Sequence, residues 1–67
     1  MMKNNLKVER AIKNVTQEEL ARIAGVSRQA INSIETGKFI PSTVLALKLS
    51  RFFEKPVNQI FQLEDGD

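Results

Sequence analysis

Four polar side chains share one face of a predicted helix, at the positions Arg28, Gln29, Asn32 and Ser33. These residue types hydrogen-bond the base edges of duplex DNA: arginine pairs with guanine, glutamine or asparagine with adenine, and serine with several bases. None of the four is acidic, which suits a surface that meets phosphate groups. However, any solvated helix exposes a polar face. Whether this face reads bases or is an ordinary helix surface must be judged from the elements that position the four side chains.

The helix that precedes this face is predicted from a capping box. In the Thr-Gln-Glu-Glu sequence at 16–19, the Thr16 hydroxyl accepts from the amide of Glu19, and the Glu19 carboxylate reaches back to the Thr16 amide. An apolar stripe follows at Leu20, Ile23 and Ala24. Gly25 ends the helix, because glycine adopts left-handed backbone angles without the penalty of a Cβ atom.

The helix that carries the polar face begins at Ser27, which is a favourable N-cap residue. Its inward stripe consists of Ala30, Ile31 and Ile34, and Gly37 closes it. Only residues 25–27 separate the two helices, which is the turn length of a helix-turn-helix. Two capped amphipathic helices joined by so short a turn favour the base-reading interpretation of the outer face.

Three further helices are predicted around this pair. The first covers residues 5–13, although Glu9 occupies a position where an aliphatic residue would pack more tightly. Ser42 caps a fourth helix that runs to about Phe53 and is apolar over more than half its circumference, so we expect it at the centre. Pro56 suits the first turn of a fifth helix, which is marked by Val57, Ile60 and Phe61.

The fold class predicted from these elements is all-α, with one compact five-helix domain over residues 1–67. We expect the tail at 62–67 to be polar and frayed, with a minor two-stranded ribbon between residues 1–3 and 61–63 as the alternative for the chain ends. With 67 residues, a domain of this size usually needs a staple or a partner. The chain has no cysteine and no histidine, so neither a disulfide nor a zinc site is expected.

Composition excludes several classes of function. No apolar run approaches the ~18 residues that cross a membrane, and no signal peptide is visible, so we expect a cytoplasmic protein without a membrane partner. The sequence shows no phosphate loop, no nucleophile with a base and no evident small-molecule ligand or cofactor site, so we do not expect an enzyme. Residues 1–40 carry seven Lys or Arg against four Glu, and residues 41–67 carry three basic against four acidic groups. This bias is weakly typical of a nucleic-acid-binding face.

The sequence resembles the lambda-repressor-like helix-turn-helix family, also called the Xre or Cro/C1 family, and in particular its short stand-alone regulators. The resemblance covers nearly the whole chain and is carried by Leu6, Arg10 and residues 16–21, 25–29, 31–32, 34–35, 37–38, 41–42, 45–47 and 60–61. It implies five helices, a helix-turn-helix motif at 16–36 and a recognition helix at about 27–36. The activity it implies is sequence-specific binding of double-stranded DNA by a transcriptional regulator. We expect a repressor, although the residues do not determine the sign of regulation.

The resemblance also implies roles for residues around the recognition helix. It assigns phosphate contacts to Gln17, Ser27, Thr36 and Lys38. At Gln17 the backbone amides and the helix dipole favour an anion as well. The alternatives are an ordinary first-turn glutamine and a solvated loop lysine. Ile40 departs from the polar residue common there, which puts one phosphate contact in doubt, and we expect Phe39 to pack inward. Arg10 and Glu35 match a structural salt bridge between the first and third helices.

One recognition helix reads too few base pairs to select a site in a genome, so we expect a homodimer on a palindromic operator. The predicted interface is an apolar cluster near the end of the chain, at Val57, Ile60, Phe61 and Leu63. The alternative is that these residues complete the core of a single copy. The competing interpretation of the whole chain is an antitoxin or a protein-interaction module on the same fold, because a fold does not determine a function.

Overall fold

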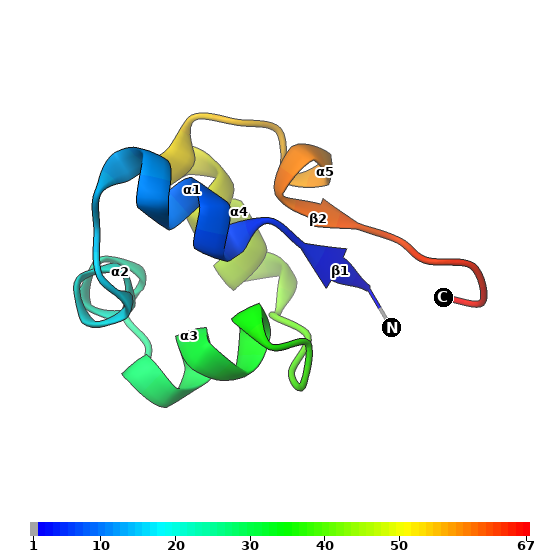
Figure 1. Cartoon of the computed structure of the whole chain (residues 1–67), viewed down its shortest axis with the longest axis horizontal. Helices are drawn as coiled ribbons and strands as arrows, with labels where there is room; N and C mark the ends of the chain where they lie inside the picture. The colour runs from blue at the N-terminus through cyan, green and yellow to red at the C-terminus, as the bar shows by residue number, and fades with distance from the viewer. Residues whose placement is uncertain (1) are drawn as a thin grey trace.

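Five helices and one short ribbon make up the computed structural model, which describes residues 2–67 (Figure 1). The helices are α1 (Leu6–Lys13), α2 (Gln17–Ala24), α3 (Arg28–Glu35), α4 (Thr43–Phe53) and α5 (Val57–Ile60), and the strands are β1 (Lys3–Asn4) and β2 (Phe61–Gln62). The predicted five-helix fold is confirmed. No helix within residues 2–67 is long and apolar enough to cross a bilayer.

Side-chain caps define where the helices begin. The capping box of α2 is present, with the Thr16 hydroxyl accepting from Glu19 N and a Glu19 carboxylate oxygen accepting from Thr16 N, both at 3.0 Å. Ser27 and Ser42 cap α3 and α4, each hydroxyl accepting from a backbone N–H three residues on at 3.1 Å. Gly25 ends α2 with φ at 75°, a conformation that costs glycine little. These local signals were predicted correctly because each involves neighbouring residues alone.

The two ends of the described chain pair as an antiparallel ribbon. Lys3 pairs with Gln62 and Asn4 with Phe61, so the predicted ribbon is present with strands at Lys3–Asn4 and Phe61–Gln62 in place of 1–3 and 61–63. Met1 lies outside the described residues. Asn4 fastens the ribbon to the end of α3, since its side-chain amide donates to the Ile34 carbonyl oxygen at 2.8 Å. Its oxygen accepts from Leu6 N at 3.0 Å. One asparagine thus joins the start of α1 to the last turn of α3.

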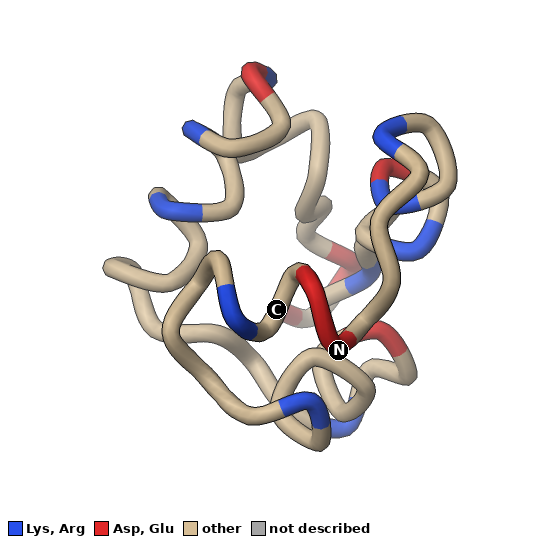
Figure 2. Tube along the Cα trace, turned by 90° about the vertical axis from the view of Figure 1, so that its left-hand side faces the viewer, with Lys and Arg blue, Asp and Glu red and all other residues tan. Residues whose placement is uncertain are grey.

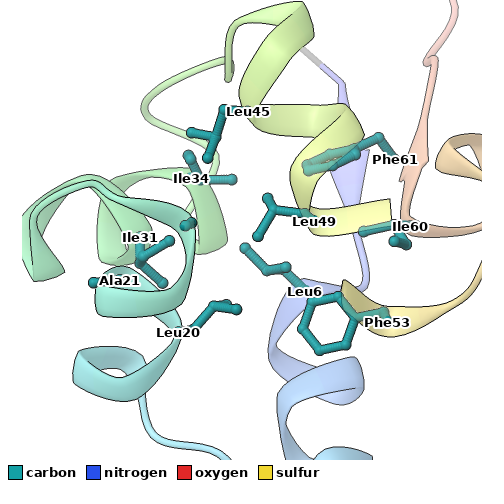
Figure 3. Packing of buried hydrophobic residues seen from close by; sticks show 11 residues of the cluster. Leu6, Leu20, Ala21, Ile31, Ile34, Leu45, Leu49, Phe53, Ile60 and Phe61 are labelled. Carbon is teal, nitrogen blue, oxygen red and sulfur yellow. The ribbon is translucent and has the colours of Figure 1, made fainter. Parts of the chain in front are cut away.

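The core lies where α1, α2, α3 and α4 meet the ribbon. Its largest fully buried side chains, several of which Figure 3 shows pointing toward one another, are Leu6, Leu20, Ile31, Ile34, Leu49 and Ile60. The prediction that α4 is enclosed was too strong, because Val44 and Leu47 are 64% and 55% exposed. In the predicted apolar stripe of α2, Leu20 and Ala24 are buried, but Ile23 is 50% exposed. Helices of eight to eleven residues meet neighbours on only part of their circumference.

Helix α1 buries an acidic residue where the apolar pattern is broken. Glu9 is only 6% exposed, whereas the neighbouring aliphatic residues Val8 and Ile12 are 56% and 64% exposed. The Glu9 carboxylate accepts from Lys55 Nζ at 2.8 Å, which joins α1 to the segment after α4. The irregular stripe of α1 therefore reflects an ion pair that the helix packs around.

We predict that Lys55→Met destabilises the protein by about 1–3 kcal/mol, because it leaves the buried Glu9 carboxylate without its partner. The double variant Glu9→Met/Lys55→Met should recover most of the loss, since two apolar side chains of similar volume often replace a buried ion pair without cost. Urea unfolding of the three proteins measures both effects.

Lys48→Met provides the control, because Lys48 is an exposed lysine on α4. Its free energy of unfolding should stay close to that of the wild type. A double variant that is as unstable as Lys55→Met would contradict the buried-pair explanation.

Candidate nucleic-acid interface

Helix α3 lies at one edge of the molecule with one side open to solvent (Figure 1). Ile31 and Ile34 are buried beneath it, as predicted, whereas Ala30 is only half-buried. The structure brings the four predicted base-reading residues together on the open side. Arg28, Gln29 and Asn32 are exposed there, and Ser33 is half-exposed.

The open side of α3 forms a ridge between two hollows. The first, of about 320 Å³, separates α3 from the start of α2 and is lined by Gln17, Arg28, Gln29, Asn32 and Ser33. The second, of about 360 Å³, is lined by Ser27, Gln29, Ala30, Ser33, Lys38 and Phe39. Gln29 and Ser33 line both hollows, so they form the crest of the ridge. A helical ridge of this kind has the shape that fits the major groove, which is about 12 Å wide.

A two-pronged ion pair holds α3 against α1. Arg10 Nε donates to one oxygen of the Glu35 carboxylate at 2.6 Å, and Arg10 Nη2 donates to the other at 3.1 Å. The salt bridge that the family resemblance implied is therefore present, with side chains only 15% and 5% exposed. Burial opposes ionisation of Glu35, but the hydrogen bonds from Arg10 and Gln17 and the charge of Arg10 outweigh it, so the pKa of Glu35 lies below its ordinary value.

Gln17 extends this network to the open side of α3. Its Nε2 donates to Glu35 Oε1 at 3.1 Å and to Asn32 Oδ1 at 3.2 Å. A side-chain amide nitrogen has two N–H groups, so both are used. A phosphate contact through this nitrogen would break the network, whereas the backbone N–H groups at the start of α2 need no such change. Sequence reasoning missed the link, because nothing in the chain marks residues 17 and 32 as neighbours.

The side chains of the other predicted phosphate contacts differ in whether they still have a free hydrogen-bond donor. The Ser27 hydroxyl accepts a hydrogen bond as the α3 cap and keeps its own hydrogen as a donor. Thr36 donates its only hydroxyl hydrogen back to the carbonyl oxygens of Asn32 and Ser33 at 3.0 and 3.3 Å. Lys38 is exposed beside the second hollow. Phe39, which was expected to pack inward, is 51% exposed next to it.

The predicted dimer cluster is divided between core and surface. Ile60 and Phe61 are 0% and 7% exposed within the chain's own core, so they are not available to a second copy, and for them the core alternative holds. Val57 and Leu63 are 36% and 77% exposed. Val57 borders an apolar groove of about 330 Å³ between α4 and α5, which is lined by Met2, Ile40, Pro41, Thr43, Ala46, Leu47, Val57, Asn58 and Phe61.

Charged residues are spread around the molecule. Figure 2 shows lysine and arginine on several separate segments, with acidic residues between them. Within residues 2–67, the basic side chains that line the two hollows are those of Arg28 and Lys38. Within residues 2–67 no group of three His, Cys, Asp or Glu side chains has a metal-binding arrangement. Apart from Arg28, the ridge consists of neutral amide and hydroxyl side chains.

A helix-turn-helix family profile matches residues 6–60. This chain belongs to the helix-turn-helix family. The matched region includes all five helices. The Xre, Cro/C1-type resemblance inferred from the residues is thereby confirmed.

Similar helix-turn-helix proteins come from archaea and bacteria. An uncharacterized HTH-type transcriptional regulator of Methanocaldococcus jannaschii is 52% identical over 66 residues, covering 98% of this chain and 100% of the relative. The regulator YgzD of Bacillus subtilis, also uncharacterized, is 41% identical over 64 residues, covering 96% and 97% of the two chains. Together these matches make this chain a DNA-binding helix-turn-helix transcriptional regulator.

Solved structures show the same arrangement of helices. A putative DNA-binding protein from Bacteroides fragilis superposes with a TM-score of 0.82 at 29% identity, covering 92% of this chain and all of that one. The restriction-modification controller protein C.AhdI from Aeromonas hydrophila superposes with a TM-score of 0.73 at 30% identity, covering 81% and 82%.

We predict that Glu35 makes the stability of this helix-turn-helix protein depend on pH. Because the pKa of Glu35 is lowered by folding, its contribution is fully present above the ordinary glutamate pKa of about 4.3 and is lost as pH falls through the folded value. Glu35→Gln should lower the free energy of unfolding at pH 7 by about 3 kcal/mol, since Arg10 loses its charged partner.

Urea unfolding at pH 7 and at pH 3.5 measures this linkage. The wild type should lose more stability between the two pH values than Glu35→Gln does. The pKa of Glu19 is also lowered, by its hydrogen bonds to Thr16, so some loss should persist in the variant. Equal losses in the two proteins would show that Glu35 is not responsible.

Proposed function

We propose that this regulator is a repressor that binds a palindromic operator as a homodimer and reads base edges with the open side of α3. The observation that carries the proposal is the acid-free ridge of Arg28, Gln29, Asn32 and Ser33 between two hollows. Arginine suits guanine and the two amides suit adenine in the major groove. The cytoplasm, where the operator lies, is the place of action, and no catalytic step is part of the proposal.

Phosphate contacts would hold the ridge in register on the duplex. Lys38 stands on one side of α3, and the first-turn backbone N–H groups of α2 at Gln17 stand on the other, where the helix dipole attracts an anion. Ser27 keeps a hydroxyl hydrogen to donate. Thr36 would have to give up its bonds to the α3 carbonyl oxygens, so we rank it last among the four.

A second copy is needed to read a site of useful length. Two copies related by a twofold axis would present their α3 helices to half-sites about 34 Å apart. We infer that the apolar groove between α4 and α5 forms the contact, because Ile40, Leu47 and Val57 expose 56%, 55% and 36% of their surface there. Leu63 is the exposed residue of the predicted cluster that lies on the tail.

Arg28→Ala tests base reading directly. The variant should bind the preferred duplex about 1–3 kcal/mol more weakly and lose base preference at one position of each half-site, because a bidentate contact to a base is removed. Gln29→Ala should act in the same way at a neighbouring position. Titrations against the selected duplex and against scrambled duplexes, each at two salt concentrations, measure affinity and specificity together.

Lys38→Ala is the matched control for these titrations. It should weaken binding to every duplex alike and reduce the salt slope by about one, since it removes one phosphate contact. An equal effect of Arg28→Ala on all sequences would argue against base reading. Wild-type protein whose binding to DNA is absent or insensitive to salt would favour an antitoxin-like or protein-interaction role.

Val57→Glu should convert the homodimer to a monomer, because it places an unpaired carboxylate in the apolar groove. Analytical ultracentrifugation across a range of concentrations gives the dissociation constant. Val8→Glu is the control, since Val8 is 56% exposed on α1 and does not line the groove. If both variants dimerise as the wild type does, the contact lies elsewhere on the molecule.

A further inference from the structure

A line of four hydrogen-bonded side chains runs from a buried charge to the DNA-facing surface. The Arg10 guanidinium donates to the Glu35 carboxylate, and Gln17 Nε2 donates to that carboxylate and to Asn32 Oδ1. Asn32 is exposed at the first hollow, at the end of this line. An asparagine amide has a donor end and an acceptor end, so its orientation decides which chemistry it offers to a base.

The orientation of each amide in this line is determined by its inner neighbour. An ionised carboxylate only accepts hydrogen bonds, so Gln17 must turn its nitrogen toward Glu35. The same nitrogen faces Asn32, and therefore Asn32 must turn its oxygen toward Gln17. The Asn32 Nδ2 group is left over. Within residues 2–67 it has no hydrogen-bonded partner on the protein, so it is free to donate to a ligand.

We propose that the Glu35–Gln17 pair locks Asn32 as a hydrogen-bond donor toward DNA, with Gln17 as a specificity-positioning residue. The base edge opposite Asn32 must then offer an acceptor, which is purine N7, guanine O6 or thymine O4. Cytosine offers the N4 amino donor there and is rejected. This inference rests on the proposed function, because it requires α3 to enter the major groove.

Turning Asn32 around to accept from cytosine would set its N–H groups against those of Gln17. That orientation loses one hydrogen bond and brings two donors together. The cost should make binding to a site with cytosine at this position about tenfold weaker. Glu35 cannot relieve the conflict, because Arg10 holds both of its oxygens at 2.6 and 3.1 Å. The preference at the DNA surface is thus determined by an ion pair that does not touch the DNA.

The test is selection of bound duplexes from a random pool by the wild type and by the variants Asn32→Ala, Gln17→Met and Gln17→Glu. The operator position read by Asn32 is the one whose preference disappears in Asn32→Ala. There the wild type should disfavour cytosine by about tenfold. Gln17→Met has a similar length and no amide, so Asn32 can turn, and the discrimination should fall to about twofold or less.

The Gln17→Glu substitution should reverse the orientation of the Asn32 side-chain amide. A carboxylate at position 17 turns away from Glu35, because two carboxylates have no hydrogen to share. Toward α3 it accepts from Asn32, so the asparagine should turn its oxygen outward and the same position should come to favour cytosine. Circular dichroism and urea unfolding confirm that each variant is folded. In the Asn32→Ala background, Gln17→Met should change no base preference, which separates a positioning effect from lost phosphate binding.

Two results would overturn the inference while leaving DNA binding intact: enrichment of cytosine opposite Asn32 in the wild type, or unchanged discrimination in Gln17→Met. Failure of the proposed function looks different, because the wild type would then enrich no duplex at all. Lys38→Ala serves as the reference for a variant that loses affinity evenly across the pool.

Discussion

The ion pair between Arg10 and Glu35 is the interaction on which the rest of this structure depends. It joins α1 to α3 with two hydrogen bonds, and its partners are largely shielded from water. A helix of eight residues has little intrinsic stability and relies on its contacts for a defined position. The pair therefore fixes the position of α3 relative to α1. Through Gln17 it also reaches a side chain that the proposed function assigns to DNA.

The proposed interface depends more on geometry than on charge. Lysine and arginine are scattered over the chain, and the net charge is only +2. Neutral amides, hydroxyls and helix N-termini form most of the ridge and its margins. Groups of this kind discriminate by position and direction, and a mispaired donor or acceptor costs more than a misplaced surface charge. With few cations beside the ridge, the proposed interface must rely on rigid placement, which the caps and the buried pair provide.

Features carried by neighbouring residues could be predicted, and features that depend on how helices cross could not. The capping box at Thr16, the left-handed Gly25 and the buried Ile31 and Ile34 follow from short-range patterns. The Glu9–Lys55 pair joins residues 46 positions apart, and Glu9 looked only like a defect in the apolar stripe of its helix. The contact between Gln17 and Asn32 requires the angle between α2 and α3, which no spacing along the chain reveals.

The burial of individual apolar residues likewise depended on how the helices pack and could not be predicted from the sequence pattern. A composition that is 42% hydrophobic indicates a packed core but does not say which members enclose it. Ile60 and Phe61 were assigned to a partner surface and instead complete the core. Val44 and Leu47 were expected inside and are exposed, because α4 is covered on one side only. In a chain this short the balance between core and contact surface is decided by three-dimensional packing.

The ribbon formed by β1 and β2 has a consequence for the folding of the protein. Asn4 bonds to the last turn of α3 and pairs with Phe61, and Asn5 N donates to the Ile60 carbonyl oxygen at 2.8 Å. The ribbon joins residues that are far apart in the sequence, so forming it closes a long loop of chain and costs conformational entropy. Fluctuations that open the ribbon should therefore also weaken the Asn4 bond to the last turn of α3.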